Sequence, residues 1–218
     1  MANQIIYGRN PVAEAERGRR RQVRRVWRAP ETSAEELERL CGSPDHQGVV
    51  AEVDPYPYGD PVGLLRRPDA LLVALDQVQD PRNLGAVCRS AEFAGAGGVV
   101  IPERRSAAVT AVACKASAGA VEHIEVAHVR NLSDWLGEAK EAGFWIWGAD
   151  AEAEATPWST DLTGPTVLVL GGEGKGLRPR VAQSCDALIA LPRSGNVDSL
   201  NVSAAATALL FESLRQRS

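Results

Sequence analysis

Strand-like and helix-like stretches alternate from residue 70 onward, and this alternation constrains the fold more than any other feature. Residues 70–76 are almost continuously apolar, as expected of a strand covered on both faces. Residues 84–94 then carry apolar side chains at helical spacing. The alternation continues through 98–101, 109–117, 124–129, 132–142, 144–148, 166–170, 180–184 and 187–191. We therefore predict an α/β domain with a mainly parallel sheet and helices on both faces.

The first 53 residues predict a separate small α/β unit. A helix is expected to start at Asn10-Pro11, with Pro11 at its first position, and Ser33 with Glu36 forms a capping-box pattern at the start of a second helix. Residues 23–27 and 48–53 have strand-forming composition. Three prolines in 54–61 exclude a helix or a central strand there. The expected organisation is a small domain at 1–53, a linker at 54–68 and a larger domain at 69–218.

Positive charge is concentrated at the amino terminus. Residues 1–30 hold eight arginines and two glutamates, a charge of +6, although the whole chain carries −4, which leaves −10 for the remainder. Guanidinium groups suit phosphate contacts, so this arginine-rich segment is a candidate docking arm for a polyanion. A merely solvated charged face is the alternative interpretation.

Cysteine usage and hydropathy indicate an ordinary soluble protein of a reducing cytoplasm. The four cysteines are widely spaced and form no pattern typical of a disulfide framework or a zinc site. No apolar run approaches the roughly 18 residues of a membrane span. The three histidines lie outside the carboxy-terminal loops described next, so neither a serine-histidine triad nor a metal site is predicted.

Three loop regions are rich in small or turn-forming residues and are predicted to form one site. Residues 168–177 are an apolar strand followed by four glycines and one acid, 191–198 form a turn-rich loop, and 199–208 lead into a helix of small residues. The glycine loop is not a P-loop, because Val169 and Gly176 stand where that motif needs a glycine and a hydroxyl residue. A purely structural glycine turn is the alternative.

Together with residues 75–91, these loops closely resemble the three signature motifs of the SpoU/TrmH family of RNA ribose 2'-O-methyltransferases. The resemblance covers about residues 70 to 218, and residues 46–51 extend it into the amino-terminal part. It implies a carboxy-terminal trefoil knot, an amino-terminal RNA-binding domain, S-adenosylmethionine as cofactor, no metal, and a homodimer. The implied reaction is methylation of a ribose 2'-hydroxyl, with a guanosine of 23S ribosomal RNA as the expected target.

The resemblance also implies site residues, each of which has a plainer alternative. The implied cofactor-binding residues are Leu170, Gly171, Gly176, Leu191 and Leu200. Core packing would equally explain the leucines. The implied catalytic residues are Asn83, Arg89, Glu173, Ser199 and Asn201. Arginine on a helix is commonly a surface ion-pair partner, glutamate in a loop is commonly solvated, and serine or asparagine before a helix is commonly a cap.

Other functions stay open at this point. The target could instead be transfer RNA or a ribosomal site whose methylation confers antibiotic resistance. A non-catalytic RNA-binding or ribosome-assembly factor with the same fold is a further alternative, although the complete set of motif residues argues against it. A small-molecule methyltransferase would leave the arginine-rich segment without a purpose.

Overall fold

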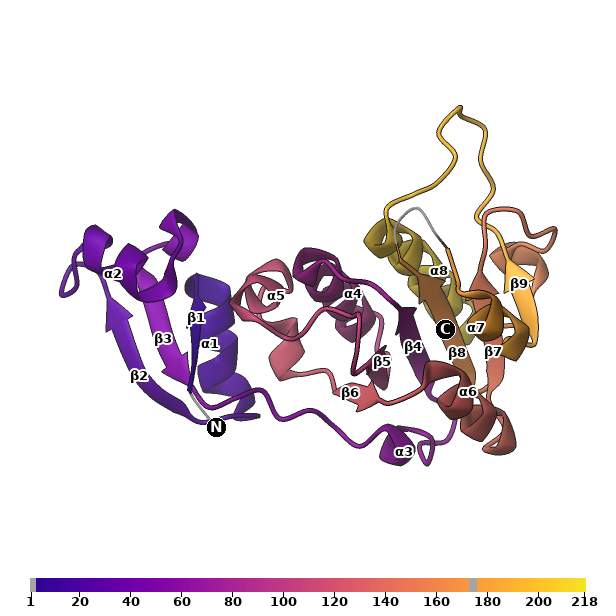
Figure 1. Cartoon of the computed structure of the whole chain (residues 1–218), viewed down its shortest axis with the longest axis horizontal. Helices are drawn as coiled ribbons and strands as arrows, with labels where there is room; N and C mark the ends of the chain where they lie inside the picture. The colour runs from indigo at the N-terminus through magenta and orange to yellow at the C-terminus, as the bar shows by residue number, and fades with distance from the viewer. Residues whose placement is uncertain (1–2, 173–175) are drawn as a thin grey trace. The chain divides into compact units, whose positions relative to one another are not determined.

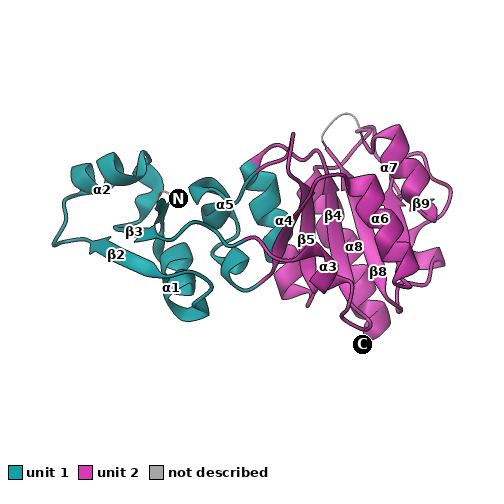
Figure 2. Cartoon of the chain, turned by 60° about the horizontal axis from the view of Figure 1, so that its bottom comes forward, with its two compact units in different colours: residues 1–57, 81–89, 108–123 teal, residues 58–80, 90–107, 124–218 magenta. Residues whose placement is uncertain are grey.

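The computed structural model describes residues 3–172 and 176–218. Packing divides the chain into two compact units (Figure 2). Unit 1 comprises Met1–Pro57, Pro81–Arg89 and Ala108–His123, and unit 2 comprises Tyr58–Asp80, Ser90–Ala107 and Ile124–Ser218. Each unit is described by itself below. In the described ranges no helix is both long and apolar enough to cross a membrane.

Unit 1 contains a small antiparallel sheet of three strands (Figure 1). Its strands are β1 (Gln4–Tyr7), β2 (Val23–Arg28) and β3 (Val49–Val53), and β3 lies in the middle. The helices α1 (Arg9–Gly18) and α2 (Ala34–Cys41) and the 3-10 turn η1 (Pro44–His46) connect them. Leu37 of α2 packs on Tyr7 and Val50, so α2 helps to close a small apolar core over the sheet.

The structure confirms the predicted second helix of this region and contains one strand that was not predicted. Ser33 caps α2 as predicted, because its side chain accepts a hydrogen bond from the amide of Glu36 at 3.2 Å. The first helix begins at Arg9, so Pro11 lies inside its first turn and not at its first position. Strand β1 was not predicted.

Three further helical segments belong wholly or partly to unit 1. Helix α5 (Ala111–Ala116) is capped by Thr110, and the 3-10 turn η2 (Ala120–Glu122) follows it. Helix α4 (Pro81–Phe93) begins at the predicted proline and continues from unit 1 into unit 2. Gly85 of α4 lies against the main chain of Ala113 and Ser117, with no room for a β-carbon. A glycine is therefore needed where α4 and α5 approach closely.

Unit 2 contains a parallel sheet of six strands, as the alternating sequence pattern predicted. The strands are β4 (Leu71–Asp76), β5 (Gly98–Pro102), β6 (Val126–Val129), β7 (Trp145–Ala149), β8 (Thr166–Gly171) and β9 (Ala187–Ile189). Their order is β6-β5-β4-β8-β7-β9, and every pairing is parallel. The carboxyl ends of all six strands therefore lie along one edge of the sheet, where α/β proteins place their ligands.

Helices α3 (Pro61–Leu64), α6 (Leu132–Glu141) and α7 (Pro179–Ser184) contribute to the main core of unit 2. Leu132, Trp135 and Leu136 of α6 pack with side chains from alternate positions of the central strands, such as Leu72 and Val169. The residues between those positions point to the opposite sheet face, because successive side chains of a strand alternate. Asn131 caps α6 as predicted.

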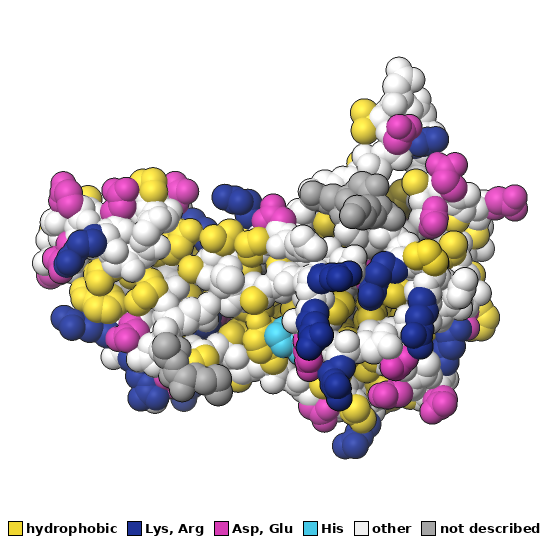
Figure 3. Space-filling model, in the orientation of Figure 1, with side chains coloured by type: hydrophobic (Ala, Val, Ile, Leu, Met, Phe, Trp, Pro, Cys, Tyr) yellow, Lys and Arg dark blue, Asp and Glu magenta, His cyan; other side chains and the backbone are white. Residues whose placement is uncertain are grey.

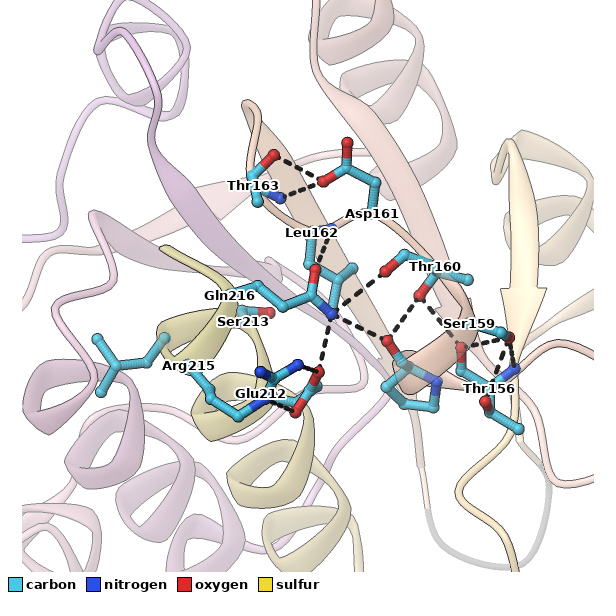
Figure 4. Close-up of polar contacts among 12 residues, drawn as sticks. Thr156, Ser159, Thr160, Asp161, Leu162, Thr163, Glu212, Ser213, Arg215 and Gln216 are labelled. Carbon is cyan, nitrogen blue, oxygen red and sulfur yellow. Dashed lines mark hydrogen bonds and ion pairs between the residues drawn. The ribbon is translucent and has the colours of Figure 1, made fainter. Parts of the chain in front are cut away.

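The last helix, α8 (Val202–Arg217), contacts β8 and is fastened to the segment before that strand (Figure 4). Gln216 accepts a hydrogen bond from the amide of Leu162 at 2.9 Å and donates one to the carbonyl of Pro157 at 3.1 Å. Pro157 belongs to the 3-10 turn η3 (Pro157–Ser159). Glu212 bonds to both Arg215 and Gln216, which organises the last turns of the helix.

Candidate active site

The loops that follow β4 and β8 are joined at the carboxyl edge of the sheet. Asp76, the last residue of β4, pairs with Gly171, the last residue of β8. The amide of Gly172 then donates to the carbonyl of Asp76 at 2.9 Å. Two of the three predicted motif regions are therefore in direct contact, although nearly a hundred residues separate them in the chain.

The carboxylate of Asp76 holds the far end of the glycine loop. It is 1% exposed and accepts hydrogen bonds from the amide of Arg178 at 2.8 Å and from the Arg178 guanidinium at 2.7 Å. One buried acid thus fixes both the start of the loop, through its carbonyl, and the return of the chain, through its side chain. Sequence reasoning missed Asp76, although an acid at the carboxyl end of a buried apolar strand was a usable signal.

Close approach of the main chain and one left-handed conformation explain the described glycines of this loop, Gly171, Gly172 and Gly176. A β-carbon on Gly171 would overlap the main chain of Gly176, and one on Gly172 would lie 2.7 Å from the carbonyl oxygen of Gln77. Gly176 has a φ of 61°, a left-handed conformation that glycine adopts without strain. A bridge between Gly172 and Gly176 closes the loop. The predicted cofactor residues Gly171 and Gly176 therefore lie together, with Leu170 buried beneath them.

The third motif region runs from the end of β9 to the start of α8. Leu191 is half-buried and follows β9, which is two strands from β8 along the same carboxyl edge. Ser199 and Leu200 are exposed, and 61% of the leucine is accessible. Leu200 therefore does not pack in the core, and its apolar surface is available to a ligand. In Figure 1 this segment extends from β9 as a long loop before it enters α8.

Asn201 caps helix α8, which is the plainer alternative to a catalytic role for this residue. Its side-chain oxygen accepts hydrogen bonds from the amide of Ser203 at 2.8 Å and from the Ser203 hydroxyl at 2.6 Å. Further along α8, the hydroxyls of Thr207 and Ser90 lie 2.7 Å apart, which links α8 to the last turns of α4 within unit 2. The start of α8 is therefore positioned by its own cap and by its neighbour.

The first motif places its two predicted residues on α4, in unit 1. Asn83 is 7% exposed in the first turn. Arg89 is exposed, and within residues 3–172 and 176–218 it has no hydrogen-bond or ion-pair partner. Among the described residues, therefore, no acid makes Arg89 a member of a surface ion pair. The predicted catalytic Glu173 lies outside the described residues.

The histidine, acidic and cysteine side chains of the described residues show neither a metal-binding cluster nor a disulfide. Among the described residues, no group of three or more histidine, cysteine, aspartate or glutamate side chains is arranged to hold a metal ion. All four cysteines are free. Burial raises the pKa of Cys88 to about 12, so this thiol of α4 stays protonated at neutral pH.

Comparison with known protein families decides the assignment. Residues 70–211 match the model of the SpoU rRNA methylase family, and residues 30–59 match the model described as RNA 2'-O ribose methyltransferase substrate binding. The chain belongs to the SpoU family. This confirms the resemblance drawn from the sequence motifs.

Named relatives of this SpoU protein support the same assignment. A protein from Mycolicibacterium smegmatis described as an uncharacterized tRNA/rRNA methyltransferase is 50% identical over 188 residues, which cover 84% of this chain and 60% of the relative. A putative TrmH family tRNA/rRNA methyltransferase of Bacillus subtilis is 45% identical over 79% of this chain and 71% of its own length. The chain thus spans about 60% of the length of several mycobacterial relatives.

Solved SpoU structures share the fold over almost the whole chain. The SpoU methyltransferase AviRb from Streptomyces viridochromogenes matches with 29% identity and a TM-score of 0.82, covering 99% of this chain and 90% of its own. A second AviRb structure holds the cofactor AdoMet and matches with 28% identity and the same TM-score, covering 99% of this chain and 91% of its own. An RNA 2'-O ribose methyltransferase matches with 26% identity and a TM-score of 0.84, covering 99% and 89%.

Proposed function

We propose that this protein transfers the methyl group of S-adenosylmethionine to a ribose 2'-hydroxyl in RNA. The observation that carries the proposal is the junction of the β4 and β8 loops, where Asp76 holds a closely packed glycine loop at the carboxyl edge of a SpoU sheet. Relatives named as tRNA/rRNA methyltransferases and the AdoMet complex of AviRb support the choice of cofactor and substrate class.

The described residues fit such a cofactor. An adenosyl group needs main-chain hydrogen-bond partners and an apolar surface. Gly171 and Gly176 bring main chain to the sheet edge without side chains in the way, and Leu200 presents an exposed apolar side chain. We assign Leu170, Gly171, Gly176, Leu191 and Leu200 to this cofactor. When bound, S-adenosylmethionine supplies an electrophilic methyl group on a sulfonium sulfur.

Arg89 is the residue that we assign to the target ribose. Guanidinium groups stay protonated in proteins, so Arg89 serves as a hydrogen-bond donor and not as a base. It would hold the 2'-hydroxyl and the adjacent phosphate. As the new oxygen–carbon bond forms, the methyl–sulfur bond of the donor would break to leave S-adenosylhomocysteine, and the hydroxyl proton would pass to that phosphate or to water. Asn83, Glu173, Ser199 and Asn201 complete the proposed constellation. Correct positioning of two reactants can supply roughly 7 to 11 kcal/mol of a barrier.

The finer assignments are part of the same proposal. We take residues 1–53 as the RNA substrate-binding domain, 54–68 as the linker and 69–218 as the catalytic domain with a trefoil knot. A guanosine of 23S ribosomal RNA in the cytoplasm is the proposed target. Because the relatives' names include tRNA, a transfer RNA is the second candidate, and locating the modified nucleotide separates the two.

A homodimer is the proposed assembly. In unit 2 the rings of Phe93 on α4 and Phe211 on α8 stack with centroids 5.9 Å apart, yet the two side chains are 75% and 40% exposed. Exposed stacked aromatics of this kind are typical of a contact surface. The substitution Phe93→Asp should convert a dimer into a monomer in analytical ultracentrifugation, and an unchanged mass would contradict the assignment of this surface.

Arg89 variants test the catalytic proposal. The protein is incubated with methyl-labelled S-adenosylmethionine and unmethylated ribosomal RNA, and transfer is followed in a single turnover. Arg89→Ala should lower the rate by at least about 10²-fold while cofactor binding is retained, because the ribose is no longer held in line. Arg89→Lys should recover little, since lysine lacks the planar two-point contact of arginine. Nearly full activity of Arg89→Lys would contradict this role.

A further inference from the structure

Half of the eight arginines at the amino terminus pair with acids within unit 1. Arg24 donates to both carboxylate oxygens of Asp54, at 2.6 and 3.0 Å. Arg28 pairs with Glu16 at 3.1 Å. Arg17 donates to Glu14 and Arg21 to the Glu122 carboxylate, whereas Arg9 and Arg20 donate to the main-chain carbonyls of Gln47 and Glu122. Most arginines of this segment therefore hold parts of unit 1 together, and four of the eight do so through a carboxylate.

A second set of arginines, in unit 2, has no acid or carbonyl partner among the described residues. Arg104 and Arg105 follow β5, and Arg130 follows β6. All three are exposed, and none has a hydrogen-bond or ion-pair partner in the described ranges 3–172 and 176–218. We call these three residues the edge arginines. One acid, Glu103, lies next to them in sequence, so the local charge remains positive.

The topology of unit 2 places the edge arginines beside the loops of the candidate site. Strands β5 and β6 are parallel neighbours, and their last residues, Pro102 and Val129, are paired. Strand β4 lies on the other side of β5 and ends at Asp76, where the glycine loop is fastened. Neighbouring strands are about 4.8 Å apart, so the ends of β5 and β6 lie roughly 5 and 10 Å from the end of β4. Figure 3 shows basic side chains gathered on one face of unit 2.

Three exposed guanidinium groups that lie close together, without a partner among the described residues, are available to bind an anion. Each can make a two-point contact with a phosphate, and the release of counterions from RNA drives such contacts. We propose that Arg104, Arg105 and Arg130 form a phosphate-contacting surface that holds the RNA backbone next to the candidate site. The surface rests on the proposed function, because RNA is its partner.

The salt dependence of RNA binding tests this surface against the amino-terminal segment. Binding of an unmethylated 23S rRNA transcript is measured between 50 and about 400 mM KCl for two triple variants. One carries Arg104→Gln, Arg105→Gln and Arg130→Gln. The matched control carries three substitutions at exposed but paired positions of unit 1: Arg17→Gln, Arg24→Gln and Arg28→Gln.

Each lost phosphate contact should reduce the slope of log K against log salt by about 0.7 to 0.9. The edge variant is expected to lose about 2 from this slope, and the control less than about 0.5. The single substitution Arg130→Gln, which should lose about 0.7 to 0.9, keeps the test decisive if the triple variant folds poorly. An unchanged slope in the edge variant, or a larger loss in the control, would overturn the proposal.

Methyl transfer at saturating RNA is measured in parallel, so that a failure of the proposed surface can be distinguished from a failure of the proposed catalytic function. Transfer by the wild-type protein with an unchanged slope in the edge variant would overturn the surface alone. The expected loss of slope without any transfer by the wild-type protein would leave the surface standing and contradict the proposed catalytic function.

Discussion

The buried ion pair between Arg21 and Glu122 should be the interaction on which unit 1 depends most. Both side chains are 1% exposed, and their charged atoms are 2.6 Å apart. Arg21 also donates to the side chain of Gln4 at 2.6 Å and to the sulfur of Cys114 at 3.1 Å. The pair thereby connects strand β1, the segment after α1, helix α5 and turn η2, four parts of unit 1 that are distant in sequence.

The substitution Arg21→Met removes one partner and leaves the carboxylate of Glu122 buried. One of its oxygens already has no hydrogen-bond partner among the described residues, so the remaining charge would be poorly compensated. Breaking a buried pair in this way costs about 3–5 kcal/mol. The matched change Arg24→Met breaks a pair whose side chains are 47% and 30% exposed, so water screens the pair and replaces most of what is lost.

Hydrogen exchange of the β3 amides reports the stability of the sheet in unit 1. A loss of about 3–5 kcal/mol corresponds to a fall in protection of roughly 10²- to 10³-fold or more, since 1.4 kcal/mol is a factor of ten. Arg21→Met should show this fall, whereas Arg24→Met should stay within about fivefold. The double change Arg21→Met with Glu122→Leu should restore much of the protection. Equal effects of the two single substitutions would refute the reasoning.

Three further predictions concern unit 2 and the thiols. Hydrogen bonds from Arg215, and to a smaller extent from Gln216, lower the pKa of Glu212 to about 2. The pKa of a glutamate in the unfolded chain is about 4.3. The ionised Glu212 therefore stabilises the folded protein above about pH 4.3, and this contribution is lost as the pH falls toward 2. The excess melting temperature of the wild type over Glu212→Gln should therefore shrink over this range, and a constant difference would count against it. Gly171→Ala should lower the free energy of unfolding by about 1–3 kcal/mol in urea, because the added carbon would overlap with Gly176. Gly137→Ala, in open space within α6, should raise it by up to about 1 kcal/mol. A larger loss of stability in Gly137→Ala than in Gly171→Ala would exclude this packing. Burial raises the pKa of Cys88 to about 12 and that of Cys114 to about 11, so iodoacetamide at pH 8 should label them only after unfolding, and rapid labelling of the native protein would contradict their burial.

The sheet of unit 2 was predictable because its information is local. Strands such as 71–76 and 166–171 are continuous apolar runs, and the helices between them show apolar spacing and side-chain caps such as Asn131. Parallel pairing then follows from the strand–helix alternation. Strand β1 was missed because its four residues give a weak pattern, and it is defined by pairing with β3 much later in the chain.

The candidate site was predictable where the residue type itself reports a local backbone requirement. The glycines at 171 and 176 reflect close approach of the main chain, and the structure shows that approach. The position of Asp76 at the end of an apolar strand marked it as notable, but its partner Arg178 lies about a hundred residues later and is brought to it only by folding. The same limit applies to the amino-terminal arginines, whose partners Asp54 and Glu122 lie outside residues 1–30 and are brought to them only by folding.

The position of the transferred methyl group tests the central claim most directly. Unmethylated ribosomal RNA is incubated with the protein and S-adenosylmethionine carrying a deuterated methyl group, digested to nucleosides and analysed by mass spectrometry. The proposed function predicts the label in the ribose fragment of one nucleoside, with guanosine expected. Label in a base fragment, or no label in any nucleoside despite cofactor binding, would contradict it.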